Sequence, residues 1–105
     1  MVHQELIADF LGWKKSLGIT YHKNNKVTTK KYFDFANNNN WNGLMEVIEK
    51  IESLNYSLEI NKQEELDYQC LITKSNNVVI QNFNQIKIDA VYQAVVEFIK
   101  QFKNN

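Results

Sequence analysis

Two segments of the chain place apolar side chains at the spacing of one helix face. The first begins at Trp41, directly after Asn40, whose side chain suits a helix N-cap, and it contains Glu46 and Lys50 at the spacing of an i,i+4 ion pair. The second lies near the C-terminus. The pattern predicts helices over 41–54 and 88–102, with inward stripes formed by Trp41, Leu44, Met45, Ile48, Ile51 and Leu54, and by Ile88, Val91, Val95, Phe98, Ile99 and Phe102.

The N-terminal third contains a shorter helical pattern and then a weak alternating one. Residues 3–12 place Leu6, Ile7, Phe10 and Leu11 on one face, and Gly12 suits a helix stop. Segment 19–35 alternates loosely around Asn24-Asn25, a pair that tolerates the positive φ angles of a tight turn. These residues predict a short helix followed by a lysine-rich hairpin or loop.

Between 56 and 83 the apolar period changes from helical to alternating. Tyr56, Leu58 and Ile60 alternate with polar residues, and Tyr68, Cys70 and Ile72 occupy every second position of the next run, which is typical of strands. We expect three antiparallel strands with turns near 62–65 and at Asn76-Asn77. The resulting order, α-(ββ)-α-β-β-β-α, predicts an α+β fold in which a small antiparallel sheet packs with three helices. A chain of 105 residues suits a single domain over 1–105.

Composition narrows the setting in which the protein works. No apolar run approaches the roughly 20 residues that a membrane-spanning helix needs, and the N-terminus lacks a basic-then-apolar secretory pattern. The lone Cys70 cannot form an intramolecular disulfide, and its strand neighbours favour a buried position. We therefore expect a soluble, cytoplasmic protein without membrane contact.

Charge is sorted along a chain whose net charge is zero. Segment 14–31 carries six lysines and no acid, whereas segment 46–67 carries seven acids and two lysines. Arginine is absent, and lysine lacks the planar fork that grips a guanine edge in duplex DNA, so base-specific duplex recognition is poorly supported. Abundant Asn and Lys are also typical of AT-rich coding sequences. A lysine-coated, solvated hairpin is therefore the alternative to a functional cluster.

The residues that catalysis requires are sparse. His3 and His22 are the two histidines, and the three glycines do not have the spacing of a phosphate-binding loop. The carboxylates of 46–67 fit a solvated helix face and a turn better than a metal or acid-pair site. We expect no enzymatic activity, no cofactor and no metal site.

Aromatic residues interleave with the lysines of the basic segment. Single-stranded nucleic-acid grooves combine such side chains, with rings that stack on bases and cations that contact phosphates. The segment therefore predicts a partner-binding surface made of Trp13, Lys14, Lys15, Tyr21, Lys23, Lys26, Lys30, Lys31 and Tyr32.

Three blocks carry a family resemblance: ELIADFLGW at 5–13, WNGLMEVIEKIESL at 41–54 and AVYQAVVEFIK at 90–100. In order and wording they resemble the phage ABA sandwich domain family, small proteins of phages and prophages. The blocks cover about a third of the chain. The resemblance implies a sheet sandwiched by helices and a phage origin, and it brings no catalytic residues. The basic stretch lies between matching blocks, so a function particular to this protein would sit there.

These observations favour a protein that acts by binding. The leading hypothesis is a phage or prophage counter-defence inhibitor, anti-CRISPR-like, that docks on a host nuclease or its guide RNA through residues 14–33. Its partner would be a host protein or ribonucleoprotein, with RNA contacted directly or not, and the chain itself a monomer or weak homo-oligomer. The alternatives are an independent RNA- or single-stranded-DNA-binding accessory protein and a virion structural or assembly protein.

Overall fold

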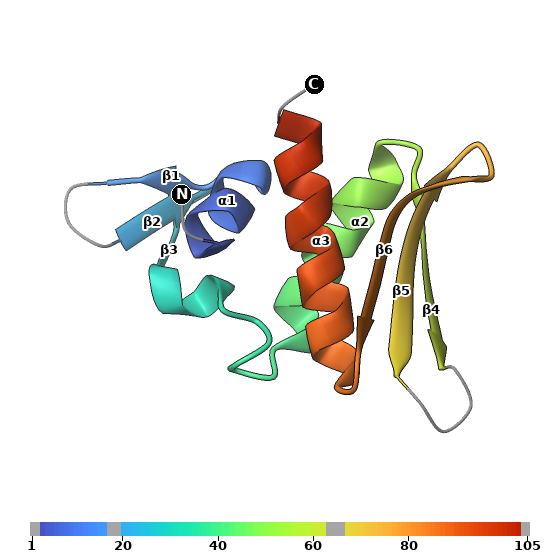
Figure 1. Ribbon diagram of the computed structural model, residues 1–105. Helices are drawn as coiled ribbons and strands as arrows, with labels where there is room; N and C mark the ends of the chain where they lie inside the picture. Colours follow the sequence, from blue (N-terminus) through green and yellow to red (C-terminus); the bar gives the residue numbers. More distant parts are fainter. Residues whose placement is uncertain (1–2, 17–19, 63–66, 104–105) are drawn as a thin grey trace.

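The computed structural model describes residues 3–16, 20–62 and 67–103, and within these ranges it contains three α-helices and two three-stranded antiparallel sheets (Figure 1). The predicted α+β class and element order are confirmed. In chain order the elements are α1 (His3–Phe10), β1 (Lys14–Lys15), β2 (Thr20–Lys23), β3 (Lys26–Thr29), the 3-10 helix η1 (Lys30–Phe33), α2 (Trp41–Ser53), β4 (Ser57–Lys62), β5 (Tyr68–Lys74), β6 (Asn77–Asn84) and α3 (Lys87–Lys103).

The N-terminal sheet contains the expected hairpin and one further strand. Asn24 and Asn25 have φ angles of 48° and 69°, as the two central residues of a tight hairpin turn require. Strand β1 pairs with the free edge of β2 and gives the order β1-β2-β3. Two residues are too few to show an alternating pattern, so periodicity could not predict β1.

The second sheet has the order β4-β5-β6. Its second turn lies one residue earlier than predicted, at Ser75 and Asn76, with φ angles of 52° and 68°. Asn77 is already in β6, where it pairs with Lys74, so the predicted Asn76-Asn77 turn is wrong by one position. The other predicted turn, near 62–65, falls largely on residues 63–66, outside the described residues.

Helices α2 and α3 stand between the two sheets (Figure 1). Helix α3 packs on β5 and β6, α2 packs on β4, and α1 and η1 lie on the opposite side of this helical layer. In the described part of the chain no helix covers the other face of β4–β6, which differs from the sheet sandwiched by helices that the family resemblance implies. The physical reason lies in α3, whose nine buried side chains are too many for one helix face. The helix therefore packs on the β4–β6 sheet with one face and on α1 with another.

The helix caps and stripes follow the sequence with local exceptions. Asn40 accepts a hydrogen bond from the Gly43 amide at 3.0 Å, which confirms the predicted N-cap. Helix α1 ends at Phe10, and Gly12 follows with a φ of +87°. Met45, predicted to face inward, is 43% exposed, because α2 is rotated so that Val47 is fully buried in its place.

Two phenylalanines, one at the end of η1 and one just after it, join the N-terminal sheet to the helical layer. Phe33 and Phe35 are completely buried, and we call them the aromatic wedge. The Phe35 ring lies against Gly43 of α2 so closely that a Cβ at this glycine would sit 2.7 Å from Phe35 Cδ1. Gly43 therefore provides the space into which the wedge docks.

Replacing Gly43 with alanine should destabilise the protein even though alanine favours helices. The added methyl group overpacks the Phe35 site, and we expect a loss of about 1–3 kcal/mol in the free energy of unfolding, measured by urea denaturation. Asn42→Ala, at the adjacent exposed position, is the matched control for helix propensity. Equal stabilities of the two variants would show that the Phe35 contact is not tight.

Candidate partner-binding cleft

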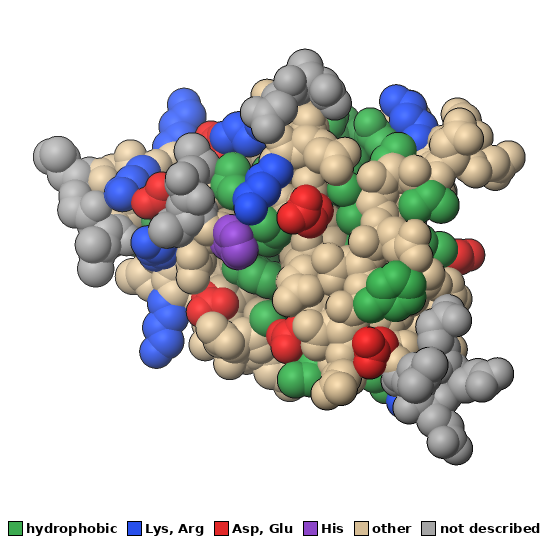
Figure 2. Space-filling model, viewed as in Figure 1, with side chains coloured by type: hydrophobic (Ala, Val, Ile, Leu, Met, Phe, Trp, Pro, Cys, Tyr) green, Lys and Arg blue, Asp and Glu red, His purple; other side chains and the backbone are tan. Residues whose placement is uncertain are grey.

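The six lysines of the basic segment gather at the end of the molecule formed by β1–β3 and η1 (Figure 2). Strand register distributes the strand lysines between two faces. Lys15 pairs with Tyr21, and Lys23 pairs with Lys26, so these positions share the side of the sheet that Tyr21 occupies. Lys14 pairs with His22 and lies on the other side, and Lys30 and Lys31 belong to η1.

Two of the six lysines are engaged within the fold. Lys23 donates from Nζ to the carbonyl oxygen of Leu11 at 2.6 Å, just beyond the end of α1. Lys15 lies 3.7 Å from the Glu5 carboxylate. Within the described ranges the other four have no carboxylate at ion-pair distance, and these free lysines are Lys14, Lys26, Lys30 and Lys31. They are the cations that remain for a partner.

Lys50 takes a different position from the predicted one. Its Nζ donates to the carbonyl oxygen of Phe10 and lies 5.0 Å from the centre of the Phe10 ring. The i,i+4 ion pair with Glu46 is therefore wrong. The last carbonyls of a helix lack intrahelical donors, and the Lys50 ammonium satisfies one of them at the end of α1.

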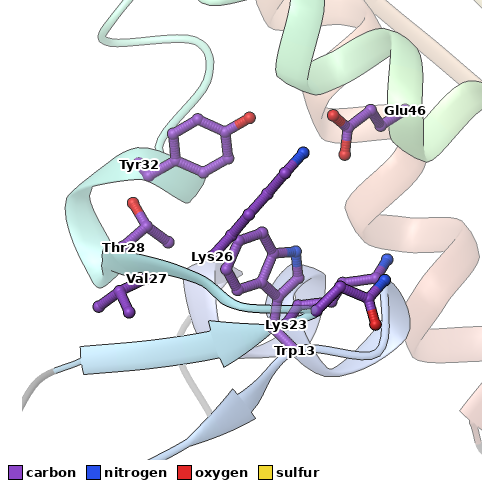
Figure 3. Close-up of a pocket in the computed structure, with 8 residues that line it drawn as sticks. Trp13, Lys23, Lys26, Val27, Thr28, Tyr32 and Glu46 are labelled. Atoms are coloured by element: carbon purple, nitrogen blue, oxygen red, sulfur yellow. The ribbon is translucent and has the colours of Figure 1, made fainter.

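A cleft with a volume of about 560 Å³ opens between the basic end and α2, and we call it the Trp13 cleft (Figure 3). In Figure 3 the Lys26 side chain extends past the Trp13 indole toward the space between Tyr32 and Glu46. The Trp13 and Tyr32 ring centres are 6.4 Å apart with an interplanar angle of 46°. The lining residues are Trp13, Lys23, Asn24, Lys26, Val27, Thr28, Tyr32 and Glu46.

The remaining predicted residues lie elsewhere on the same end. Lys15, Lys30 and Lys31 line a second hollow of about 340 Å³, together with Glu5, Thr29 and Tyr21. Tyr21 itself is only 3% exposed, and its ring centre is 5.4 Å from that of Phe33. Contrary to the prediction, Tyr21 offers no surface on which a base can stack, because the aromatic wedge uses it as a core residue.

Glu46 belongs to the cleft although the sequence pattern predicts only a solvated helix face for it. Its position on the outside of α2 is as predicted, but the docking of η1 brings it opposite Lys26 (Figure 3). Burial raises the pKa of Tyr32, the negative charge of Glu46 raises it further, and a hydrogen bond with Asn40 opposes both effects. Helix periodicity predicts that Glu46 lies on the outer side of α2, but it does not predict which element packs beside that side. No sequence signal therefore identifies Glu46 as a residue of the cleft.

The structure also places the groups with catalytic potential. Ser16 Oγ lies 2.7 Å from Nε2 of exposed His22, but no carboxylate orients this imidazole in the described part of the chain. Cys70 is fully buried, and burial raises its thiol pKa to about 12, far from that of a reactive thiolate. Among described residues no group of three or more His, Cys, Asp or Glu is arranged to hold a metal, and no helix has the length and apolarity to cross a membrane.

Removing the Lys23 ammonium should cost stability, whereas removing the Lys26 ammonium should not. Lys23→Met leaves the Leu11 carbonyl without its cationic donor, and we expect a loss of about 1 kcal/mol in the free energy of unfolding. Lys26→Met, the matched control in the neighbouring strand, should change it by less than about 0.5 kcal/mol. Urea denaturation measures both, and equal losses would contradict a structural role particular to Lys23.

Known proteins provide no template for this site. Comparisons with protein-family models, with curated protein sequences and with solved structures give no match for this chain. The resemblance to the phage ABA sandwich family therefore rests on the three sequence blocks alone. The Trp13 cleft and the free lysines beside it are the features of the molecule that point to a function.

Proposed function

We propose that this chain is a small non-enzymatic phage or prophage protein that inhibits a host defence nuclease by docking on it, with the RNA of that nuclease as the surface contacted. The observation that carries the proposal is the concentration of four free lysines at one end of the molecule, beside a cleft that contains two partly exposed aromatic rings. The phage setting comes from the three blocks that resemble the phage family. The host cytoplasm is the compartment in which such an encounter takes place.

The charge pattern favours a phosphate-rich partner. Free ammonium groups on a protein surface attract polyanions and release the counterions condensed on them, which makes binding depend on salt. Four phosphate contacts to a single strand would weaken binding about fiftyfold between about 50 and 200 mM salt. An RNA-guided nuclease displays such a strand on a folded protein.

The small aromatic area favours RNA presented by a protein over naked nucleic acid. Single-strand-binding proteins rely on several exposed rings that stack on successive bases. Here Tyr21 and Phe33 are buried, and among the described Trp, Tyr and Phe rings at this end only Trp13 and Tyr32 are partly exposed. A second contact, with the protein that carries the RNA, would supply the affinity that two rings and four lysines do not.

Capture of host partners by matched charge-reversal variants tests this function. Changing Lys26, Lys30 and Lys31 to Glu should abolish recovery of the nuclease complex, because repulsion replaces attraction at the proposed surface. The control changes Lys74, Lys87 and Lys100 to Glu, three exposed lysines on other elements with the same total change in charge. The measurement is the set of proteins recovered, with and without ribonuclease, and the inhibition of the captured nuclease.

The pattern of loss discriminates between the candidate functions. Equal loss from both triple variants would point to a general charge effect and contradict a localised surface. Recovery of RNA without any specific protein would favour the independent RNA-binding accessory function. Unchanged recovery by the Lys26, Lys30 and Lys31 variant would overturn the proposal.

The exposed apolar side chains of β6 favour self-association in a virion or assembly role as a second candidate. Strand β6 is at the edge of its sheet, with Val78, Val79 and Phe83 exposed by 54%, 38% and 47%, and Ile86 just beyond it is 57% exposed. Edge strands with apolar side chains are prone to pair with another copy. Strand β6 lies on the opposite side of the helical layer from β1–β3 (Figure 1), and residues of β3 line the Trp13 cleft.

Sedimentation equilibrium over a wide protein concentration range tests the assembly role. If β6 forms a working interface, the protein should associate, and Val78→Lys combined with Phe83→Lys should return it to a monomer. A monomer at every concentration would rule out self-association through this edge. The counter-defence function is compatible with a monomer or a weak homo-oligomer and does not require association through β6.

A further inference from the structure

Opposite charges face each other across the Trp13 cleft without meeting. Lys26 and Glu46 both line it, and among the described residues no ion pair joins them at 4.0 Å or less. Figure 3 shows the Lys26 ammonium directed into the space beside the Glu46 carboxylate. A ligand that enters there meets an ammonium donor beside a pair of acceptor oxygens.

Guanine is the base whose Watson–Crick edge matches this arrangement. It presents an acceptor, O6, next to two donors, N1–H and the N2 amino group. A carboxylate accepts both donors as a bidentate pair, and an ammonium donates to O6. Adenine offers one donor and one acceptor, and uracil one donor between two acceptors, so neither satisfies both Glu46 oxygens.

The walls of the cleft suit a single unpaired base. Trp13 and Tyr32 provide partly exposed ring surface, and the cleft volume lies within the roughly 300–1,000 Å³ that is usual for small-ligand sites.

We propose that the Trp13 cleft holds one unpaired guanine of the partner's RNA, with Glu46 as the specificity-determining residue. The inference rests on the proposed function and specifies its RNA contact. Glu46 accepts from N1–H and N2–H, Lys26 donates to O6, and the base packs against the exposed ring surface of Trp13 and Tyr32. Lys30 and Lys31, outside the cleft on η1, remain for the phosphates of neighbouring nucleotides.

Short RNA heptamers test the base preference directly. Four fluorescein-labelled heptamers, uridine at every position except the centre, carry G, A, C or U there, and anisotropy at about 50 mM salt measures their affinities for the full chain. The G heptamer should bind about tenfold more tightly than the A heptamer, since a good bidentate contact discriminates by about fivefold to more than a hundredfold. Quenching of tryptophan emission by the G heptamer should accompany binding.

Glu46→Gln is the decisive variant, and Glu49→Gln is its matched control. Glutamine offers one acceptor where the carboxylate offers two, so the preference for G should fall to less than about twofold. Glu49 lies on the same helix, is exposed and does not line the cleft, so its replacement makes the same charge change and should leave the preference intact. Urea denaturation confirms that both variants are folded.

Several outcomes would overturn the guanine site. Equal binding of the four heptamers would do so, as would a G preference that survives in Glu46→Gln. Tighter G binding by that variant would show that Glu46 only neutralises Lys26. If no heptamer binds but nuclease capture still depends on Lys26, Lys30 and Lys31, the guanine site is wrong and the docking function stands. Selective G binding without any captured nuclease would support the guanine site and contradict the docking function.

Discussion

The aromatic wedge is the contact on which the rest of the structure depends. Phe33 lies within 5.6 Å, between ring centres, of Trp13 and Tyr21, and Phe35 continues the cluster to Tyr92 of α3 at 6.4 Å. Removing a buried phenylalanine side chain typically costs about 3–5 kcal/mol, which is a large part of the stability of a domain this size. The cleft exists because these rings hold the N-terminal sheet at a fixed distance from α2.

Lysine side chains that stabilise the end of α1 are not available to bind a partner. The carbonyl oxygens of Phe10 and Leu11 accept from Lys50 of α2 and Lys23 of β2, so two elements are fastened to the terminus of a third. Helix C-termini attract cations because their last carbonyls lack intrahelical donors. A lysine cluster in a sequence therefore overstates the positive charge available to a partner, by an amount that only the folded contacts reveal.

Local sequence signals predicted the helices, strands and turns. Tertiary packing determined which side chains are buried and which line the cleft. Asparagine pairs, the Asn40 cap and apolar periodicity each depend on a few neighbouring residues, and these features were predicted to within a residue or two. The position of Glu46 depends on how η1 docks, and the burial of Tyr21 depends on where Phe33 goes. Both result from packing between residues that are distant in the sequence, and neither can be predicted from hydrophobic periodicity or from a motif.

A carboxylate in a basic surface has a physical use if the partner is RNA. Lysines alone bind any polyanion, and in a cell rich in RNA such a surface would be occupied by the wrong molecules. Glu46 repels phosphate from the cleft, so the strand backbone is directed toward Lys30 and Lys31 while a base edge is admitted. Rejection of competitors contributes to specificity as much as attraction of the right partner does. On this proposal the free lysines supply salt-dependent affinity, and Glu46, the one acid among the described residues that line the cleft, selects what enters.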